Sequence, residues 1–114
     1  MEEFGNKTIV HCYGHGGSGW TTLFGSVKKA MSFHTPAPHK APVRIIGAGC
    51  IGLAMAIELS MLGYPIAGIT AKSLYDTPSW VAAGYFALVS VKTSKEKQKE
   101  LDEIELETFH TYRD

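Results

Sequence analysis

A glycine-rich stretch near the middle of the chain constrains the fold more than any other part of the sequence. Residues 43–46 (Val-Arg-Ile-Ile) have the composition of a buried strand, and an apolar, helix-like segment follows them after Gly47, Gly49 and Gly52. This G-x-G-x-x-G spacing is typical of a strand that turns into a helix beneath the pyrophosphate of a dinucleotide. Gly47 would permit the tight turn, Gly49 a close approach of the phosphates, and Gly52 close packing of helix on strand. A glycine turn used only for packing is the alternative interpretation.

The segments after this stretch predict a strand–helix–strand unit. The apolar helix is expected to end at Gly63, in the manner of a C-terminal cap, and residues 66–72 are expected to form the next strand. Dinucleotide sites commonly have an Asp or Glu for the ribose hydroxyls about 20 residues past the glycines. Ala71 and Lys72 stand there instead, which weakens an NAD interpretation. Lys72 is left to neutralise a 2′-phosphate, to cover an adenine ribose or to point into water.

A second glycine loop lies closer to the N-terminus. Residues 7–13 have the β-branched and aromatic composition of a strand, residues 14–19 contain four glycines, and apolar residues then recur at helical spacing through 20–33. Such a loop can turn its N–H groups toward an anion or form a tight connection, and its position before a helix favours the anion. Together with a strand over 43–48, these elements predict a right-handed βαβ unit whose two glycine loops share the carboxyl edge of a parallel sheet.

Histidine and cysteine residues do not gather at metal-binding spacings. His34 and His39 lie in a proline-rich linker, residues 34–42, and lack a third ligand, so we expect them to be exposed to solvent. Cys12 and Cys50 form no C-x-x-C pair and are expected to be reduced, buried thiols. We therefore expect no metal site.

The C-terminal part of the chain begins with a turn and ends in a long helix. Residues 76–80 are turn-like, residues 81–85 are mostly small, and residues 86–91 are expected to form a strand or extended segment. Residues 93–96 (Thr-Ser-Lys-Glu) have the pattern of a capping box, which predicts a helix over 95–112. We expect its charged residues to face solvent and an apolar stripe to pack in the core, formed by Leu101, Ile104, Thr108, Phe109 and Tyr112.

Composition narrows the classes of partner. The chain of 114 residues carries eleven basic and eleven acidic side chains, so no charged surface for nucleic acid is expected. The acidic segment 1–4 has no apolar signal core, and no apolar run reaches the roughly 18 residues of a membrane span. We expect one cytoplasmic domain that has neither nucleic acid nor a membrane as a partner.

Three of these segments together resemble the FAD-binding half of the D-amino acid oxidase family. Residues 11–21 (His-Cys-Tyr-Gly-His-Gly-Gly-Ser-Gly-Trp-Thr) resemble the family's flavin-contacting glycine motif, and residues 46–53 (Ile-Gly-Ala-Gly-Cys-Ile-Gly-Leu) resemble its FAD fingerprint. Residues 81–84 (Val-Ala-Ala-Gly), with Thr77 and Ser79 before them, resemble a third family segment that lies against the flavin and the pyrophosphate. The resemblance implies an α/β fold, a Rossmann-like FAD-binding parallel sheet with flanking helices.

The order of the motifs differs from that of the family. In the family the fingerprint opens the chain and the His-Gly-Gly motif lies near its end, whereas here the His-Gly-Gly motif comes first. The chain thus resembles a circularly permuted FAD-binding half, because a linker of about ten residues, up to ~33 Å long when extended, can make such a join. The resemblance implies one FAD-binding domain over 1–114. Its parts are the His-Gly-Gly segment 7–33, the linker 34–42, the fingerprint and Val-Ala-Ala-Gly segment 43–94, and the C-terminal helix 95–112.

The resemblance also assigns cofactor contacts to positions in this chain. The pyrophosphate is expected to contact four fingerprint residues, namely Gly47, Gly49, Ile51 and Gly52. The adenosine is expected near Thr70, Ala71 and Lys72, and phosphate or ribityl oxygens near Thr77 and Ser79. The isoalloxazine ring is expected to lie along Ala83, Gly84 and Tyr85. The flavin carbonyl and ribityl chain are expected to be reached by Gly17, Ser18, Gly19, Trp20 and Thr21, with His15 orienting that loop instead of acting as a base.

The family's substrate domain has no counterpart in these 114 residues. We therefore expect an FAD-binding module of a flavoprotein that oxidises amines or amino acids, with no catalytic residue of its own and no efficient oxidation by this chain alone. Its expected partners are FAD and either the missing substrate domain or a second copy docked on the same face. Two alternatives stay open: an NAD(P)-binding domain, in which Lys72 would favour NADP, and a non-catalytic, truncated interaction module.

Overall fold

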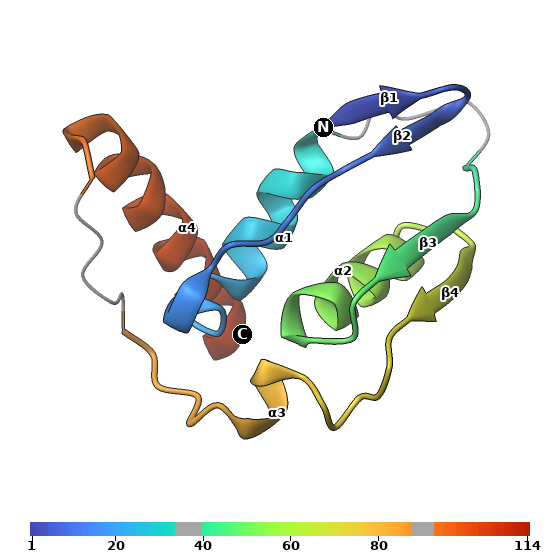
Figure 1. Cartoon of the computed structure of the whole chain (residues 1–114). Coiled ribbons are helices and arrows are strands. Elements are labelled where there is room, and N and C mark those ends of the chain that lie inside the picture. The colour runs from blue at the N-terminus through green and yellow to red at the C-terminus, as the bar shows by residue number, and fades with distance from the viewer. Residues whose placement is uncertain (34–39, 88–92) are drawn as a thin grey trace.

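Within the residues that the structure describes, the chain forms two small sheets and three longer helices. A computed structural model describes residues 1–33, 40–87 and 93–114, and Figure 1 shows how the elements are arranged. In chain order the elements are β1 (Glu2–Phe4), β2 (Lys7–Ile9), the short 3-10 helix η1 (Gly16–Ser18), α1 (Leu23–Ser32), β3 (Val43–Ile46), α2 (Cys50–Met61), β4 (Ile66–Thr70), α3 (Pro78–Val81) and α4 (Lys95–Arg113). The mixed α/β class expected from the sequence is confirmed. The parallel sheet of the described residues has two strands, so the Rossmann-like architecture stays a prediction.

The glycine-rich stretch forms the expected strand–helix–strand unit. β3 and β4 are parallel neighbours, in which Ile45 pairs with Ile69 and Ile46 pairs with Thr70. α2 joins the two strands and packs against both of them. A two-stranded sheet and a single helix are each marginal alone, so the apolar face buried between them stabilises the unit. The buried residues that α2 contributes are Ala54, Ala56 and Leu59.

The end of α2 is capped at Gly63, as expected. Gly63 has a φ of +82°, a left-handed conformation that glycine adopts without steric cost. Its N–H donates to the carbonyl of Ser60 at 2.9 Å, and the N–H of Tyr64 donates to the carbonyl of Leu59 at 2.9 Å. These two bonds form a Schellman motif, which satisfies the last carbonyls of the helix.

The N-terminal strand does not join this sheet, so the βαβ unit predicted from strands 7–13 and 43–48 is wrong. β2 is three residues long and pairs antiparallel with β1, with Phe4 opposite Lys7. Gly5 has a φ of +62° in the two-residue turn between them, as tight hairpins require. A hairpin closes a loop of two residues, whereas pairing with β3 needs a long crossover, so the local pairing has the smaller entropic cost.

The helices predicted over 20–33 and 95–112 are both confirmed as α1 and α4. α1 lies between α4 and α2 (Figure 1) and packs against both. On the α2 side, Leu23 and Val27 form a buried cluster with Ala54. α1 is therefore the central helix of the molecule.

The predicted capping box over 93–96 is wrong, although α4 begins close to it. The N-cap is Ser94, whose hydroxyl accepts a hydrogen bond from the N–H of Lys97 at 3.3 Å. A capping box at 93–96 would make Thr93 the cap. The position three residues after Ser94 is Lys97, which has no carboxylate to return the bond, so the cap is a single one.

The apolar stripe of α4 is buried unevenly. Thr108 is fully buried, and Leu101 and Ile104 are partly buried. Phe109 and Tyr112, toward the C-terminal end, keep 42 and 46% of their surface exposed. The predicted core packing is therefore confirmed for Thr108 and in part for Leu101 and Ile104, and it is wrong for Phe109 and Tyr112, which lie at the exposed end of the α1–α4 contact.

The remaining expectations fall partly outside the described residues. His34 and His39 lie outside them, as does most of the predicted strand 86–91, whose described residues Phe86 and Ala87 have no regular secondary structure. Of residues 76–80, which were expected to form a turn, Asp76 and Thr77 precede α3, and residues 78–80 belong to that single helical turn. In the ranges 1–33, 40–87 and 93–114, no helix combines the length and the hydropathy needed to cross a membrane.

Candidate functional site

The fingerprint glycines have the geometry that close packing and a tight turn require. Gly47 has a φ of +109°, a left-handed conformation suited to glycine. A Cβ at Gly52 would overlap the carbonyl oxygen of Gly47, so only glycine allows α2 to start this close to β3. Gly49 has an ordinary φ of −75°, and a Cβ there would lie 3.1 Å from the hydroxyl oxygen of Ser79. The roles predicted for Gly47 and Gly52 are confirmed, whereas that of Gly49 stays a prediction.

Ser79 caps the start of α2 from a distant part of the chain. The N–H of Cys50, the first residue of α2, donates to the Ser79 hydroxyl at 2.9 Å. α3 holds this serine in place, and Thr77, at the N-cap of α3, donates its own hydroxyl to the carbonyl of Leu74 at 3.1 Å. The next N–H groups of α2, at Ile51 and Gly52, have no acceptor within the helix. The start of α2 therefore offers donors and a positive dipole end beside a hydroxyl.

The second glycine loop lies beside the same helix start. Gly14 and Gly16 have positive φ values of 87° and 55°, which fold the loop back on itself. The N–H of Ser18 then donates to the carbonyl of His15 at 3.0 Å, which closes the turn η1. An added Cβ at Gly19 would lie 3.8 Å from the sulfur of Cys50, so this loop reaches α2 although its preceding strand is not part of the parallel sheet.

Thr21 joins the second glycine loop to the segment after α3. Its side chain is fully buried. The hydroxyl accepts a hydrogen bond from the N–H of Ala87 at 3.0 Å, and its one hydrogen has two carbonyl acceptors within reach, that of Ala87 at 3.0 Å and that of Tyr85 at 3.3 Å. This hydroxyl, predicted to reach the ribityl chain, is thus engaged with the protein backbone.

A cavity of about 460 Å³ opens between the second glycine loop, the segment after α3 and the last turn of α4. We call it the aromatic cavity, and its lining residues are Trp20, Ala82, Gly84, Phe86, Phe109, Tyr112 and Arg113. The cavity includes Trp20 and Gly84, two of the predicted flavin contacts. It does not include Ala83 or Tyr85, whose side chains are exposed. Its volume falls in the usual range for small-molecule pockets, about 300–1,000 Å³.

One residue that lines this cavity, Trp20, has a buried polar atom for which the described residues provide no partner. Within the described part of the chain, the indole Nε1 of Trp20 is buried and makes no hydrogen bond. A buried donor without an acceptor typically costs about 1–3 kcal/mol. An acceptor oxygen brought to this nitrogen would satisfy the donor.

The residues predicted to hold the adenosine lie at the carboxyl end of β4. The carbonyl of Thr70 accepts a hydrogen bond from the N–H of Gly47 at 2.8 Å, so this strand end is adjacent to the fingerprint turn. The side chains of Thr70, Ala71 and Lys72 are exposed. Among the described residues, Lys72 takes part in no ion pair, so its ammonium group is open to an anion.

Burial shifts the pKa values of three side chains, those of His15, Tyr112 and Cys12. Burial lowers the pKa of His15 below its ordinary value, which favours the neutral imidazole. Burial raises the pKa of the Tyr112 hydroxyl, and the nearby Cys50 adds to that rise. Burial also raises the pKa of the Cys12 thiol, so this cysteine is a weak nucleophile at neutral pH.

The described residues hold no group of three or more His, Cys, Asp or Glu side chains that could bind a metal ion.

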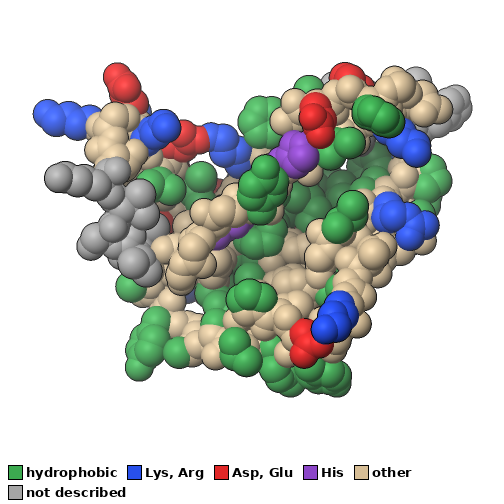
Figure 2. All heavy atoms as spheres, viewed as in Figure 1, with side chains coloured by type: hydrophobic (Ala, Val, Ile, Leu, Met, Phe, Trp, Pro, Cys, Tyr) green, Lys and Arg blue, Asp and Glu red, His purple; other side chains and the backbone are tan. Residues whose placement is uncertain are grey.

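Around α3 and the segment that follows it, hydrophobic side chains gather along the lower edge of the molecule (Figure 2). Trp80, Val81 and Tyr85 in this region keep 61, 81 and 84% of their surface exposed. An apolar surface of this kind is typical of one that another protein segment covers.

Sequence reasoning did not single out the α4 side of the site. Phe109, Tyr112 and Arg113 line the aromatic cavity together with Phe86. The signal in the sequence was the aromatic pair at positions 109 and 112, whose spacing of three places both rings on one helix face. The sequence predicts core packing for this pair, because nothing in it shows that the helix face extends beyond the neighbouring helix.

Comparisons of this chain with protein-family models, with curated proteins and with solved structures find no match in any of the three.

Proposed function

We propose that the chain is an FAD-binding module that resembles the cofactor-binding half of the D-amino acid oxidase family. FAD supplies the ring that accepts a hydride when it is bound. The chain's own residues bind and orient the cofactor. Oxidation of an amine or amino acid would need a substrate-positioning domain, which we propose as the partner of the exposed apolar surface around α3.

The observation that carries this proposal is the meeting of three loops at the start of α2. The Ser79 hydroxyl lies 2.9 Å from the Cys50 N–H, and the loop before Trp20 approaches the Cys50 side chain. These loops come from three segments that are separate in the sequence. Close packing of two segments requires small residues only where those two segments touch. An anion-binding site, in contrast, benefits from a helix N-terminus, a hydroxyl and a glycine loop in one place.

In this proposal each end of the cofactor has its own set of residues. The N–H groups at the start of α2 would hold the pyrophosphate, with Ser79 beside them. The end of β4 would hold the adenosine, where Thr70 and Lys72 are the polar side chains present. The glycine loop and residues 83–85 would hold the flavin.

A second candidate is an NADP-binding domain, favoured by one observation. The end of β4 has no carboxylate for a ribose diol, and its Lys72 is exposed. A lysine at this place suits a 2′-phosphate. The second glycine loop favours FAD over NADP. It lies outside the fingerprint unit and resembles a motif that contacts the flavin.

Titration of the purified chain with FAD, followed by flavin absorbance and fluorescence, tests the proposal. Binding of about one FAD per chain that ADP displaces is the expected result. Stronger binding of NADPH than of FAD would favour the second candidate, and binding of neither would assign the glycines to packing.

A matched pair of variants sharpens this test. Gly49→Ala has an allowed φ and its nearest neighbour would be the end of the Ser79 side chain, so the variant should fold. Its methyl group would still block the phosphates, and we expect about a tenfold or greater loss of FAD affinity. Ser60→Ala, at the exposed far end of the same helix, should bind FAD like the wild-type chain.

A further inference from the structure

The aromatic cavity is built on one side by a helix to which no ligand role has been given. Phe109, Tyr112 and Arg113 all belong to the last turns of α4. Two further aromatic residues line the cavity, namely Trp20, which directly follows the second glycine loop, and Phe86, in the segment after α3. The cavity therefore brings three separate parts of the chain around one apolar space.

Its aromatic walls are fixed to one another. The Tyr112 hydroxyl donates to the carbonyl of Trp20 at 3.0 Å, and the Tyr112 ring meets that of Phe24 edge-on with centroids 5.3 Å apart. The rings of Phe86 and Phe109 lie 5.7 Å apart. These contacts hold the rings in place around the cavity, so the rings need little reordering when a ligand binds.

One wall of the cavity is short of side-chain bulk. Ala82 and Gly84 both line it, and a Cβ at Gly84 would have no atom within 4 Å. Gly84 also has a φ of +70°, which a larger residue would adopt only with strain. A flat molecule can therefore lie against the backbone here, with aromatic rings around it.

Among the described residues that line the cavity, Arg113 is the one with a charged side chain. Arg113 has its guanidinium carbon 5.9 Å from the centroid of the Phe109 ring. In the part of the chain that the structure describes, no carboxylate lies within ion-pair distance of Arg113. A planar guanidinium next to aromatic walls suits a ring that carries carbonyl oxygens, because it can stack and donate hydrogen bonds at once.

We propose that the aromatic cavity is a pocket for a planar aromatic ring that bears carbonyl oxygens, in which Phe109 is a stacking face and Arg113 donates to the ring oxygens. The inference rests on the proposed function in one respect, because it takes the ring to be the isoalloxazine of the cofactor. It goes further because it assigns a direct part in binding to α4. This helix lies outside the second glycine loop, the fingerprint and the Val-Ala-Ala-Gly segment. In this arrangement the chain supplies its own ring-binding wall.

Two probes separate the ring from the phosphates. Riboflavin has the ring and ribityl chain without phosphate, whereas ADP has the phosphates without the flavin ring. We expect riboflavin to bind the wild-type chain and its fluorescence to be quenched by the surrounding aromatic side chains. Loss of one base-sized stacking face typically weakens ring binding about tenfold, so Phe109→Ala should bind riboflavin about tenfold more weakly and ADP as well as the wild type does.

Three further variants control for folding and for charge. Leu106→Ala removes an exposed side chain of the same helix that does not line the cavity, and it should leave riboflavin binding unchanged. Phe109→Trp restores a stacking face and should restore binding. Arg113→Gln keeps a hydrogen-bond donor without the charge, and we expect an intermediate loss of several-fold. Circular dichroism of each variant checks that the helices are intact.

The outcomes distinguish the pocket from the proposed function. Riboflavin binding that is absent from the wild-type chain, or equal in the wild type and Phe109→Ala, overturns the pocket even where FAD and ADP bind. An equal loss of ADP and riboflavin affinity in Phe109→Ala also overturns it, because the effect is then not confined to the ring. Phe109-dependent riboflavin binding without any binding of FAD or ADP would support the pocket and reject the FAD proposal.

Discussion

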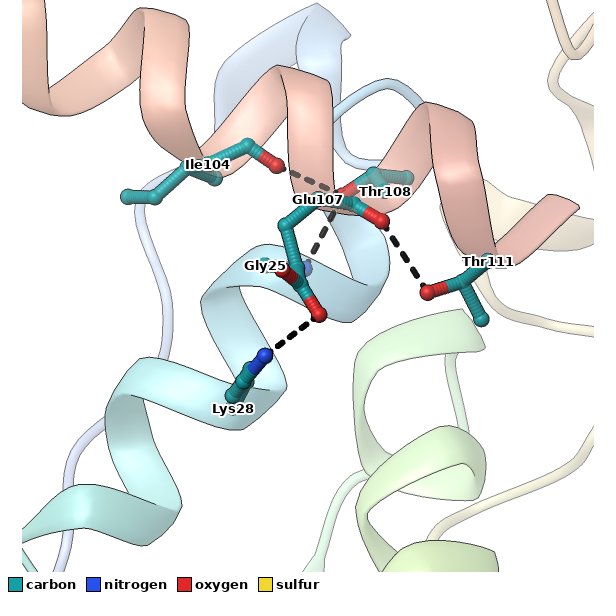
Figure 3. Close-up of polar contacts among 6 residues, drawn as sticks. All are labelled: Gly25, Lys28, Ile104, Glu107, Thr108 and Thr111. Carbon is teal, nitrogen blue, oxygen red and sulfur yellow. Dashed lines mark hydrogen bonds and ion pairs between the residues drawn. The ribbon is translucent and has the colours of Figure 1, made fainter.

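The N–H of Gly25 donates a hydrogen bond to the Thr108 hydroxyl at 2.9 Å, where α1 and α4 cross (Figure 3). Gly25 is in the first turn of α1, where backbone N–H groups have no acceptor within the helix. The Thr108 hydroxyl in turn donates a hydrogen bond to the carbonyl of Ile104, also at 2.9 Å. A buried threonine of one helix thus caps the start of another, and the glycine allows the two backbones to touch.

Gly25→Ala is expected to destabilise the fold strongly. An added Cβ would overlap the carbonyl group of Ile104, which is backbone and cannot turn aside. Forcing the helices apart should lower the free energy of unfolding by about 1–3 kcal/mol or more, measured by urea denaturation. Gly19→Ala is the matched control, because its Cβ would make an ordinary 3.8 Å contact at a helical φ of −55°. Equal stability of the two variants would contradict the close crossing.

Thr108→Val should separate the contribution of the hydroxyl's hydrogen bond to stability from that of the side chain's packing. The two side chains are nearly isosteric, but valine leaves the buried N–H of Gly25 without an acceptor, at a cost of about 1–3 kcal/mol in unfolding free energy. Thr108→Ser keeps the hydroxyl and should retain more of the stability than Thr108→Val does. Thermal unfolding of the two variants compares them directly, and a valine variant as stable as the serine variant would show that the hydrogen bond contributes nothing.

Ser79→Ala removes the hydroxyl that caps α2. Loss of a helix-capping hydroxyl usually costs about 1 kcal/mol, and here it also frees α3 from the start of α2. We expect a lower urea midpoint, together with faster hydrogen exchange at the Cys50 amide. Ser73→Ala, which removes a local bond to the Tyr75 N–H on an exposed loop, should have a smaller effect on both measurements.

His15 should make stability depend on pH in the mildly acidic range. Burial lowers its pKa in the folded chain, whereas the unfolded chain has the ordinary value of 6.5. Between these two pKa values the unfolded chain binds more protons, so the free energy of unfolding rises with pH. The full stability is present above the unfolded pKa and is lost as the pH falls through 6.5 toward the folded pKa. Denaturation curves across this range should show the slope in the wild type and a shallower slope in His15→Gln.

The elements that could be predicted are those whose causes are local in the sequence. The β3–α2–β4 unit follows from apolar runs around fixed glycines, and the cap at Gly63 follows from the left-handed conformation that glycine alone adopts readily. The partner of residues 7–13 could not be predicted in the same way. Pairing depends on competition between a short hairpin and a long crossover, and the turn at Gly5 decided that competition in favour of the hairpin.

For the candidate site, the sequence indicated which loops matter but not how they meet. The spacing of Gly47 and Gly52 predicted their geometry, because the steric constraint on each glycine comes from residues no more than six positions away. The bond between Ser79 and the start of α2 joins positions 29 residues apart, and no periodicity encodes such a contact. The aromatic cavity could not be predicted for the same reason, since Phe109 lines it only because α4 packs against α1.

The pairing of α1 with α4 also bears on how the chain is made. Ribosomes add about 5–20 residues per second, so α1 emerges several seconds before the helix that caps it. The β3–α2–β4 unit, whose contacts are close in sequence, is complete in the interval and can form first. α1 is therefore synthesised before α2 and α4 but completed after the β3–α2–β4 unit, because its hydrogen bond to Thr108 forms only once α4 has been made.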